Sequence, residues 1–274
     1  QQTVKRSFTL GGIGLHSGEY AAIRVRPAFA GEGRYFVRVP LGERRKIPAR
    51  SYLHLSNLNV FGASVHSVEA LLSALECCGV DNARIEMEGG EEVPVADGSA
   101  IGWAINIVVA GLQPAHAVGD AKGRTEKRRA LKPTQAVTVQ EGDAFVSLYP
   151  SNTLKISCGV DCPAAPIIGR QWKSWVPDQD EHYRWIIAPA RTFYTSLEVY
   201  NLRSRGLIKG GTIGAALIAY GSDWYEDGMA RFYEDEPARH KIVDLTGDLA
   251  LLSGEGSQGL PIGHIVAYNA DHAL

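Results

Sequence analysis

Residues 67–78 carry a helical repeat with two different faces, and this repeat restricts the fold more than any other part of the chain. One face is apolar and comprises Val68, Leu71, Leu72 and Leu75. The opposite face carries small side chains, namely Ala70, Ser73, Ala74 and Cys77. A helix with no charged face predicts that a second element packs closely on its small side. Gly79 stands where a helix is expected to end.

Short alternating segments surround this helix. We expect strands at 22–26, 35–39, 83–88, 136–139, 144–148 and 154–160, and further helices at 100–110, 196–203 and 237–252. The helix at 100–110 is expected to be buried, because Asn106 is its only polar side chain. Each half of the chain has strands followed by helices, which indicates an α+β fold with helices covering one sheet face.

A charged segment divides the chain. Residues 119–130 are polar and rich in Lys and Arg, so we interpret them as a linker between domains at 1–118 and 131–274. The two halves look alike in plan, although no repeat is visible residue by residue.

Composition excludes several classes of protein. The net charge of −2 leaves no basic footprint for nucleic acid, and no apolar run is long enough for a transmembrane segment. The first residues lack the apolar core of a signal peptide. Cys77, Cys78, Cys158 and Cys162 are expected to be reduced thiols packed as small apolar groups.

The helix at 237–252 carries the first candidate site residues. His240, Asp244 and Asp248 recur every four residues and therefore share one face, where His and Asp can reach one metal ion and a further carboxylate can orient a ligand. The alternative is a solvated polar face, and spacing alone favours that alternative.

Four further residues have a chemical and an ordinary interpretation. Glu69 suits a general base beside a metal-bound water, or a first-turn carboxylate that favours the helix dipole. His272 suits a general acid, or a frayed terminal residue. Arg191 and Thr192 suit polarisation of a carbonyl, or a loop before a helix that Thr195 or Ser196 caps.

Several motifs occur together in a fixed order. They are Gly14–Gly18, Val65–Leu75, Gly79–Asn82, Val93–Ala100, Ala190–Phe193, Ser204–Leu207 with Gly210–Gly211, Arg239–Asp244 with Gly247–Asp248, and His272–Leu274. With this set the chain resembles the UDP-3-O-acyl-N-acetylglucosamine deacetylase family, zinc amidases of lipid A synthesis, over its whole length. The sequence at 29–36 is similar to that of plant-type members.

The resemblance implies two similar α+β domains, each a sheet with two covering helices, and helices sandwiched between the sheets. It also implies a site between the domains, where a zinc-bound water attacks the acetamide carbonyl of a sugar nucleotide. By the same resemblance His240 and Asp244 match zinc ligands, and Glu69 matches the general base. The remaining matches are His272 to a residue that stabilises the transition state or protonates the leaving amine, Thr192 to a hydroxyl aimed at the carbonyl oxygen, and Lys241 and Asp248 to supporting residues.

The chain departs from the family pattern at four places. Ala70 stands where members carry the third zinc ligand, and His66, one turn earlier, is expected to lie at or before the helix start and to point elsewhere. Ala144 stands where members place a Lys against the substrate phosphates. Residues 55–58 replace a Thr-rich segment, and the chain stops at Leu274 where members continue, which would expose apolar surface.

Three functions are therefore compatible with the sequence. We favour a catalytically degenerate homologue, a pseudoenzyme, that serves as a structural or interaction subunit of a larger assembly with protein partners. The alternatives are an active zinc deacetylase, in which Ala70 is compensated or is an introduced substitution, and a protein that binds a sugar nucleotide or acyl chain without turnover. We expect a bacterial cytoplasm or a eukaryotic organelle, plastid or mitochondrion, as the location.

Overall fold

The computed structural model describes residues 1–39, 45–48, 58–60, 63–120, 123–177, 183–212, 214–225, 230–232, 234–252, 259–272 and 274. The replaced segment at 55–58 lies outside these residues except for Leu58. No helix among the described residues combines the length and the apolarity needed to cross a membrane.

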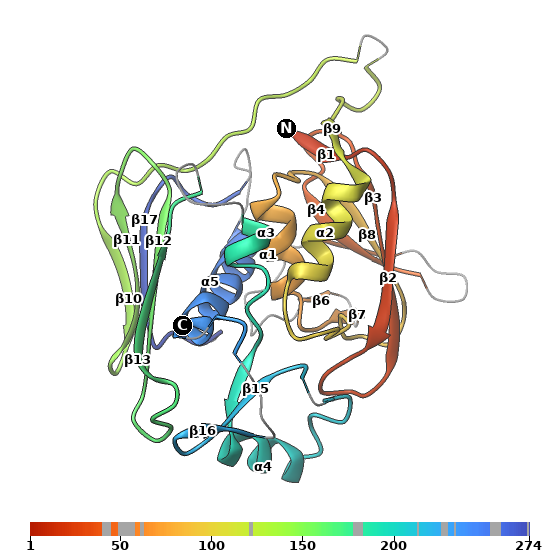
Figure 1. The fold of residues 1–274 in the computed structure, drawn as a ribbon. Coiled ribbons are helices and arrows are strands. Elements are labelled where there is room, and N and C mark those ends of the chain that lie inside the picture. The colour runs from red at the N-terminus through yellow and green to blue at the C-terminus, as the bar shows by residue number, and fades with distance from the viewer. Residues whose placement is uncertain are drawn as a thin grey trace.

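Two five-stranded sheets form the outer layers of the molecule (Figure 1). The first sheet has the order β2-β3-β8-β4-β5, with β2 at Phe8–Ile13, β3 at Tyr20–Pro27, β4 at Arg34–Arg38, β5 at Arg45–Pro48 and β8 at Ala83–Gly89. The second has the order β10-β11-β17-β12-β13, with β10 at Val137–Glu141, β11 at Ala144–Pro150, β12 at Lys155–Cys162, β13 at Gly169–Trp175 and β17 at Gly263–Tyr268.

The two sheets share one topology. In each, the last strand in sequence enters the middle, where it pairs parallel with one neighbour and antiparallel with the other: β8 lies between β3 and β4, and β17 between β11 and β12. The expectation of two halves alike in plan is borne out in strand order and direction, which a comparison of residues did not reveal.

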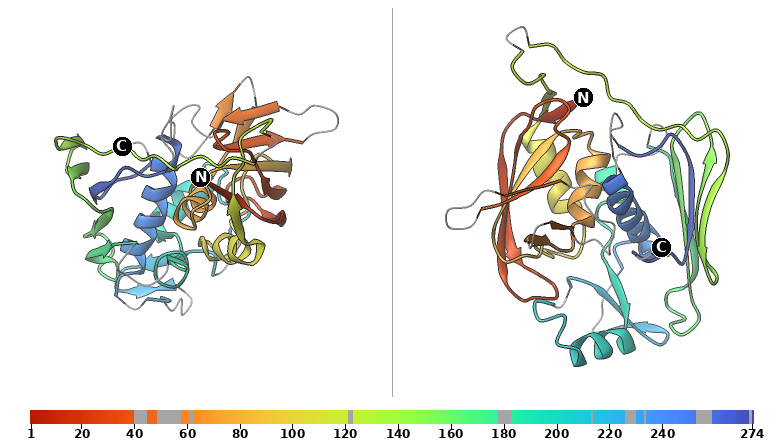
Figure 2. Two further views of the ribbon diagram at one scale, coloured as in Figure 1. Left: turned by 90° about the horizontal axis from the view of Figure 1, so that it is seen from above. Right: turned by 180° about the vertical axis from the view of Figure 1, so that it is seen from behind.

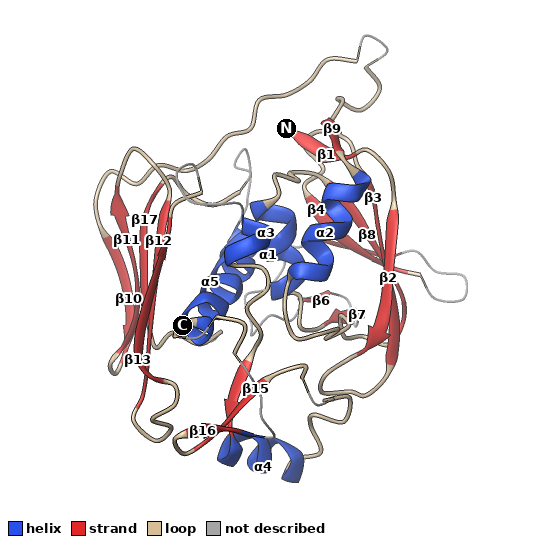
Figure 3. Cartoon of the chain, in the orientation of Figure 1, coloured by secondary structure: helices blue, strands red, loops and turns tan. Residues whose placement is uncertain are grey.

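Helices fill the space between the sheets (Figure 3). They are α1 at Glu69–Cys77, α2 at Ile101–Ala110, the short α3 at Tyr183–Ile186 and α5 at Glu236–Leu249, which a 3-10 turn at Ala250–Leu252 extends. One apolar cluster runs through all the layers, from Ile23 and Leu72 to Ile242 and Ile156. The predicted α+β class, with helices sandwiched between two sheets, is confirmed.

The small face of α1 packs on α5, as its sequence predicts. Ser73 lies between the two helices and hydrogen-bonds with Thr246 and with the Tyr183 hydroxyl at 2.7 Å. Gly247 approaches the backbone of Glu69 so closely that a Cβ atom there would lie 2.2 Å from the Glu69 carbonyl oxygen. The helix ends at Cys77, and Gly79 has a φ of +81°.

The expectation that the helix at 100–110 is buried is only half correct. Trp103, Ala104 and Ile107 are buried in α2, but Ile105, Val108 and Val109 are 44%, 47% and 64% exposed. The physical reason is position: α2 lies at the flank of the helical layer, and Figure 2 shows it from above, with the rest of the layer on one side only.

Smaller elements complete the fold. Two pairs of short strands lie on the first half: β1 at Gln2–Val4 with β9 at Leu112–Pro114, and β6 at Leu58–Val60 with β7 at Ala63–Val65. A third unit consists of β14 at Phe193–Thr195, α4 at Ser196–Ser204, β15 at Leu217–Tyr220 and β16 at Asp223–Trp224. Thr195 caps α4 in a capping box with Glu198, which settles the choice between Thr195 and Ser196.

Candidate active site

A cavity of about 960 Å³ opens between the two halves of the chain. The first half contributes residues around the start of α1, among them Glu69 and Ala70. The second half contributes the segment before α4 and the polar face of α5. The cavity thus gathers most of the candidate residues: its lining includes Glu69, Thr192, His240, Asp244 and His272.

The polar face of α5 is buried and not solvated. His240 and Asp244 are only 6% and 8% exposed, and His240 Nε2 lies 3.1 Å from Asp244 Oδ1. The solvated face that spacing alone favoured is therefore wrong for these two residues. Periodicity could not decide this, because a helix facing a polar cavity has the same pattern as one facing water.

His240 has an oxygen at each ring nitrogen. Its Nδ1 lies 2.9 Å from the Ala190 carbonyl oxygen, and its Nε2 faces Asp244. Both neighbours accept hydrogen bonds, so the protonated imidazolium satisfies both. Burial lowers the pKa of His240, but Asp244 and the Ala190 carbonyl raise it by more, so the net shift of the pKa is upward.

Asp244 is surrounded by cations. Lys241 Nζ lies 3.4 Å from its other carboxylate oxygen, and His272 adds a further positive charge. Burial raises the pKa of Asp244, but His240 and Lys241 lower it far more, so the carboxylate is ionised. Lys241 also lies 5.8 Å from the centre of the Phe193 ring.

Glu69 stands opposite this face as the first residue of α1. Its Oε2 atom is shielded from solvent and has no hydrogen-bond partner in the described part of the chain. Burial raises the pKa of Glu69 to about 7; His272 lowers it, and Asp244 and Asp248 raise it. A carboxyl group with this pKa can take and return a proton near neutral pH.

His272 is not frayed. Its Nδ1 lies 2.8 Å from Asp248 Oδ2, which fixes the ring at the edge of the cavity. Burial lowers the pKa of His272, but the hydrogen bond to Asp248 and the charges of Asp244, Asp248 and Glu69 raise it to about 10. The ring is therefore a cation at neutral pH, able to donate a proton or to stabilise negative charge.

Thr192 and Arg191 are neighbours with different surroundings. Thr192 lines the cavity, and its main-chain N–H donates to the Gly98 carbonyl at 2.8 Å. Arg191 does not line the cavity; its Nε donates to buried Glu236 Oε1 at 3.0 Å. The interpretation of Arg191 as a carbonyl-polarising cation is thus not supported by its position.

Glu92 lines the cavity beside the first motif, whose residues Leu15, His16 and Ser17 line it as well. The carboxylate of Glu92 accepts hydrogen bonds from the main-chain N–H groups of His16 and Ser17 and from the Ser67 hydroxyl. Burial raises the pKa of Glu92, but the hydrogen bonds from the main-chain N–H groups of His16 and Ser17 lower it below its ordinary value. Sequence reasoning did not identify Glu92, and no local pattern distinguishes it from Glu91.

Tyr194 and Glu236 are two more residues that sequence reasoning missed. Tyr194 lines the cavity, and burial raises the pKa of its phenol to about 12, with Asp244 and Glu69 nearby. Glu236 is fully buried at the start of α5. A buried Glu at a helix start looks in sequence like any first-turn carboxylate.

The donors present do not fit a three-ligand zinc site. Catalytic zinc takes three protein ligands and a water, and here His240 and Asp244 line a cavity to which position 70 contributes only a methyl group. Across the described ranges, no three His, Cys, Asp or Glu side chains are grouped to hold a metal ion. His66 lies before the start of α1, as expected, but the expectation that it points elsewhere is wrong, because His66 lines the same cavity. Among the described residues it is nevertheless not grouped with His240 and Asp244 closely enough to complete a metal site.

The second altered position lies apart from this cavity. Ala144 begins β11 directly after the β10–β11 turn and pairs with Glu141. It is not among the residues that line the cavity.

Comparisons with known proteins agree over the whole chain. The family model for UDP-3-O-acyl N-acetylglycosamine deacetylase matches residues 1–274. Two similar proteins named UDP-3-O-acyl-N-acetylglucosamine deacetylase come from Synechocystis, at 39% identity over 99% of this chain and 94% of the relative, and from Thermosynechococcus vestitus, at 42% over 100% and 90%. The Arabidopsis thaliana protein named probable UDP-3-O-acyl-N-acetylglucosamine deacetylase 1, mitochondrial, is 37% identical over 100% of this chain and 85% of the relative.

Proposed function

The chain belongs to the UDP-3-O-acyl N-acetylglycosamine deacetylase family, and from this premise we propose that it keeps the family's pocket but does not hydrolyse the N-acetyl group. One observation carries the proposal: the Ala70 methyl group lines the cavity where the family resemblance requires a third zinc ligand. Amide hydrolysis needs an activated water, and zinc supplies that activation in the family. A two-donor remnant would hold zinc weakly.

The rest of the site supports binding without turnover. The cavity persists, and its lining includes Glu69, Thr192, His240, Asp244 and His272. A sugar nucleotide bound there would therefore meet both positively and negatively charged side chains. Glu69 can accept a proton from water, and His272 can stabilise negative charge. Neither group supplies the Lewis acid that the amide carbonyl requires.

We further propose that the protein serves as an interaction subunit of a larger assembly. This role is supported by the apolar outer face of α2, where Ile105, Val108 and Val109 are exposed. Because such a face favours contact with a partner, the protein purified from its source should have a native mass above that of one chain.

The second candidate function is an active deacetylase. It is favoured by the retention of Glu69, Thr192, His240, Asp244 and His272 around one cavity. The two candidates differ in a measurable way, because only the active enzyme holds zinc firmly and releases acetate from UDP-3-O-acyl-N-acetylglucosamine.

Ala70→His tests the proposal directly. We expect the unmodified chain to retain little zinc and to release no acetate, and Ala70→His to bind about one zinc ion per chain and gain turnover. Elemental analysis and an acetate-release assay measure both. Ala70→Leu is the matched control, because leucine fills the space without offering a lone pair.

The opposite results would decide against the proposal. Stoichiometric zinc with acetate release by the unmodified chain would establish the active deacetylase, and His66→Ala would then show whether His66 supplies the third ligand. An Ala70→His variant that folds but binds no zinc would contradict the observation that carries the proposal, because the change at Ala70 would then not account for the lost metal site.

A further inference from the structure

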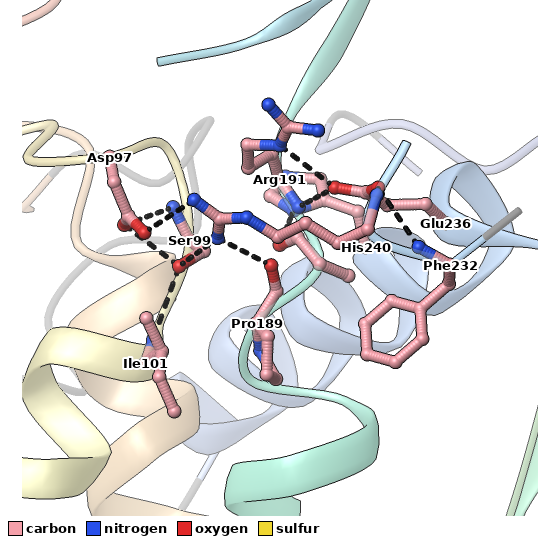
Figure 4. A network of polar contacts seen from close by, with 10 residues as sticks. Asp97, Ser99, Ile101, Pro189, Arg191, Phe232, Glu236 and His240 are labelled. Carbon is pink, nitrogen blue, oxygen red and sulfur yellow. Dashed lines mark hydrogen bonds and ion pairs between the residues drawn. The ribbon is translucent and has the colours of Figure 1, made fainter. Parts of the chain in front are cut away.

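A network of polar contacts around Glu236 lies next to His240, and Figure 4 shows it from close by. We propose that Glu236 is a positioning residue: it holds the segment that carries the Ala190 carbonyl, and this carbonyl in turn fixes the His240 ring. The inference concerns the metal-free chain as it stands and does not depend on the proposed function.

Glu236 is built to accept hydrogen bonds only. It is fully buried, and Arg191 donates to its Oε1 through both the main-chain N–H and Nε, each at 3.0 Å. The main-chain N–H groups of Arg231 and Phe232 donate to its Oε2. One carboxylate therefore joins the start of α5 to the Arg191 segment and to residues 231–232.

These hydrogen bonds of Glu236, which we call the clamp, hold the same peptide group that contacts the His240 ring. The Arg191 N–H that Glu236 binds belongs to the peptide whose carbonyl is that of Ala190, and this carbonyl lies 2.9 Å from His240 Nδ1. A shift of this peptide moves the acceptor directly. His240 and Glu236 lie one turn apart on α5, so the helix fixes one end of the path and the peptide fixes the other.

Arg231 extends the clamp to the first half of the chain. Its guanidinium pairs with Asp97 at 2.9 Å and donates to the Pro189 carbonyl at 2.8 Å. Two main-chain hydrogen bonds run beside it, from Ala100 to the Ala188 carbonyl and from Thr192 to the Gly98 carbonyl. The segment that orients His240 is thus held from both halves of the molecule.

Glutamine is an informative replacement at this position. A Gln side chain has nearly the same shape as Glu, but its amide group donates, so one side of the clamp would place donor against donor. We expect Glu236→Gln to loosen the Ala190–Arg191 peptide and expose the His240 Nδ1 proton. The control is Asp161→Asn, which breaks the exposed ion pair with Arg170 in the same half of the chain.

Proton exchange at His240 Nδ1, followed by ¹⁵N NMR and assigned through His240→Asn, reads out the position of the ring without any metal. Loss of a charge-assisted clamp should raise the exchange rate about tenfold or more in Glu236→Gln, and Asp161→Asn should leave it unchanged. A folded Glu236→Gln variant with the unmodified exchange rate would overturn the proposal.

A second variant covers the case in which Glu236→Gln does not fold. Arg231 is partly exposed, so Arg231→Gln should fold, and it should raise the same exchange rate by a smaller factor because it cuts the link to Pro189 and Asp97. An unchanged rate in Arg231→Gln would then overturn the inference.

A metal titration separates this inference from the proposed function. In an Ala70→His background, Glu236→Gln should weaken Co²⁺ binding by about 10–100-fold, as loss of a ligand's support does, and Asp161→Asn should have no effect. Failure of Ala70→His itself to bind Co²⁺ would contradict only the assignment of the lost metal site to Ala70, because the exchange measurement needs no metal.

Discussion

At the scale of single residues, Glu69 is subject to two opposing effects on its ionisation. A proton acceptor has to be ionised, yet burial favours the neutral form, and the Oε2 atom of Glu69 has no partner to compensate for lost water. Burial raises the pKa of this carboxyl group to about 7, against an ordinary 4.5. The folded protein therefore becomes less stable when Glu69 ionises.

Glu69→Gln should remove this cost. Below pH 4.5 the carboxyl is protonated in both the folded and the unfolded chain, but between 4.5 and about 7 the folded state binds the proton more tightly. The free energy of unfolding therefore falls as pH rises through this window. The variant should match the unmodified chain below pH 4.5 and exceed it above pH 7, by up to about 3 kcal/mol.

Denaturant unfolding across this pH range measures the effect, and the exposed Glu88→Gln serves as control. Equal pH dependence in Glu69→Gln and the unmodified chain would contradict the raised pKa. The same residue illustrates what sequence can show: the pattern placed Glu69 at a helix start, but only the tertiary structure shields its Oε2 atom from solvent.

At the scale of elements, the contact between α1 and α5 depends on one glycine. A Cβ atom at Gly247 would lie 2.2 Å and 2.6 Å from the carbonyl oxygen and Cα of Glu69. Both are main-chain atoms, so neither can move aside without shifting α1. The small face of α1 and Gly247 together allow the two helices to approach.

Gly247→Ala should therefore separate the helices. We expect a loss of about 1–3 kcal/mol from overpacking, although alanine favours helix by about 1 kcal/mol over glycine. Gly102→Ala in α2 is the matched control, because its Cβ atom would meet nothing within 4 Å and it should be neutral or stabilising. Thermal unfolding compares them; a Gly247→Ala variant as stable as Gly102→Ala would refute the close contact.

At the scale of the whole molecule, Glu76 joins segments that are distant in the sequence. Arg34 of β4 lies 2.7 Å from its carboxylate, Arg128 of the segment between the halves pairs with it, and the Leu260 N–H donates to it at 2.9 Å. Arg128 also pairs with Asp81 at 3.2 Å. The segment 119–130, which we still interpret as a linker, is thus attached to the first half at Arg128.

Glu76→Gln should weaken all of these links at once. It leaves the Arg34 guanidinium, 2% exposed, without its carboxylate, and breaking a buried pair costs about 3–5 kcal/mol. We also expect faster tryptic cleavage near Arg128. Glu86→Gln, which removes more exposed pairs with Arg26 and Arg84, should cost at most about 1 kcal/mol; equal losses would contradict the role of Glu76.

By itself, the sequence determined the local elements and the family. Helical and alternating periodicity placed α1, α5 and the strands β3, β4, β8, β10, β11 and β12 to within a few residues, because burial of one face leaves a repeat that can be counted. It also predicted close packing on the small face of α1. It did not find β13, an edge strand that pairs with the preceding strand β12, or β17, whose partners β11 and β12 lie far away along the chain.

Only the tertiary structure decided how the candidate residues meet. The Ala190 carbonyl at His240, the pairing of His272 with Asp248 and the clamp at Glu236 join residues separated by 50, 24 and 45 positions. No local repeat records such contacts. The helix repeat gave His240 and Asp244 a common face, but whether that face meets water or a buried cavity depends on the opposite layer, and this layer comes from the other half of the chain.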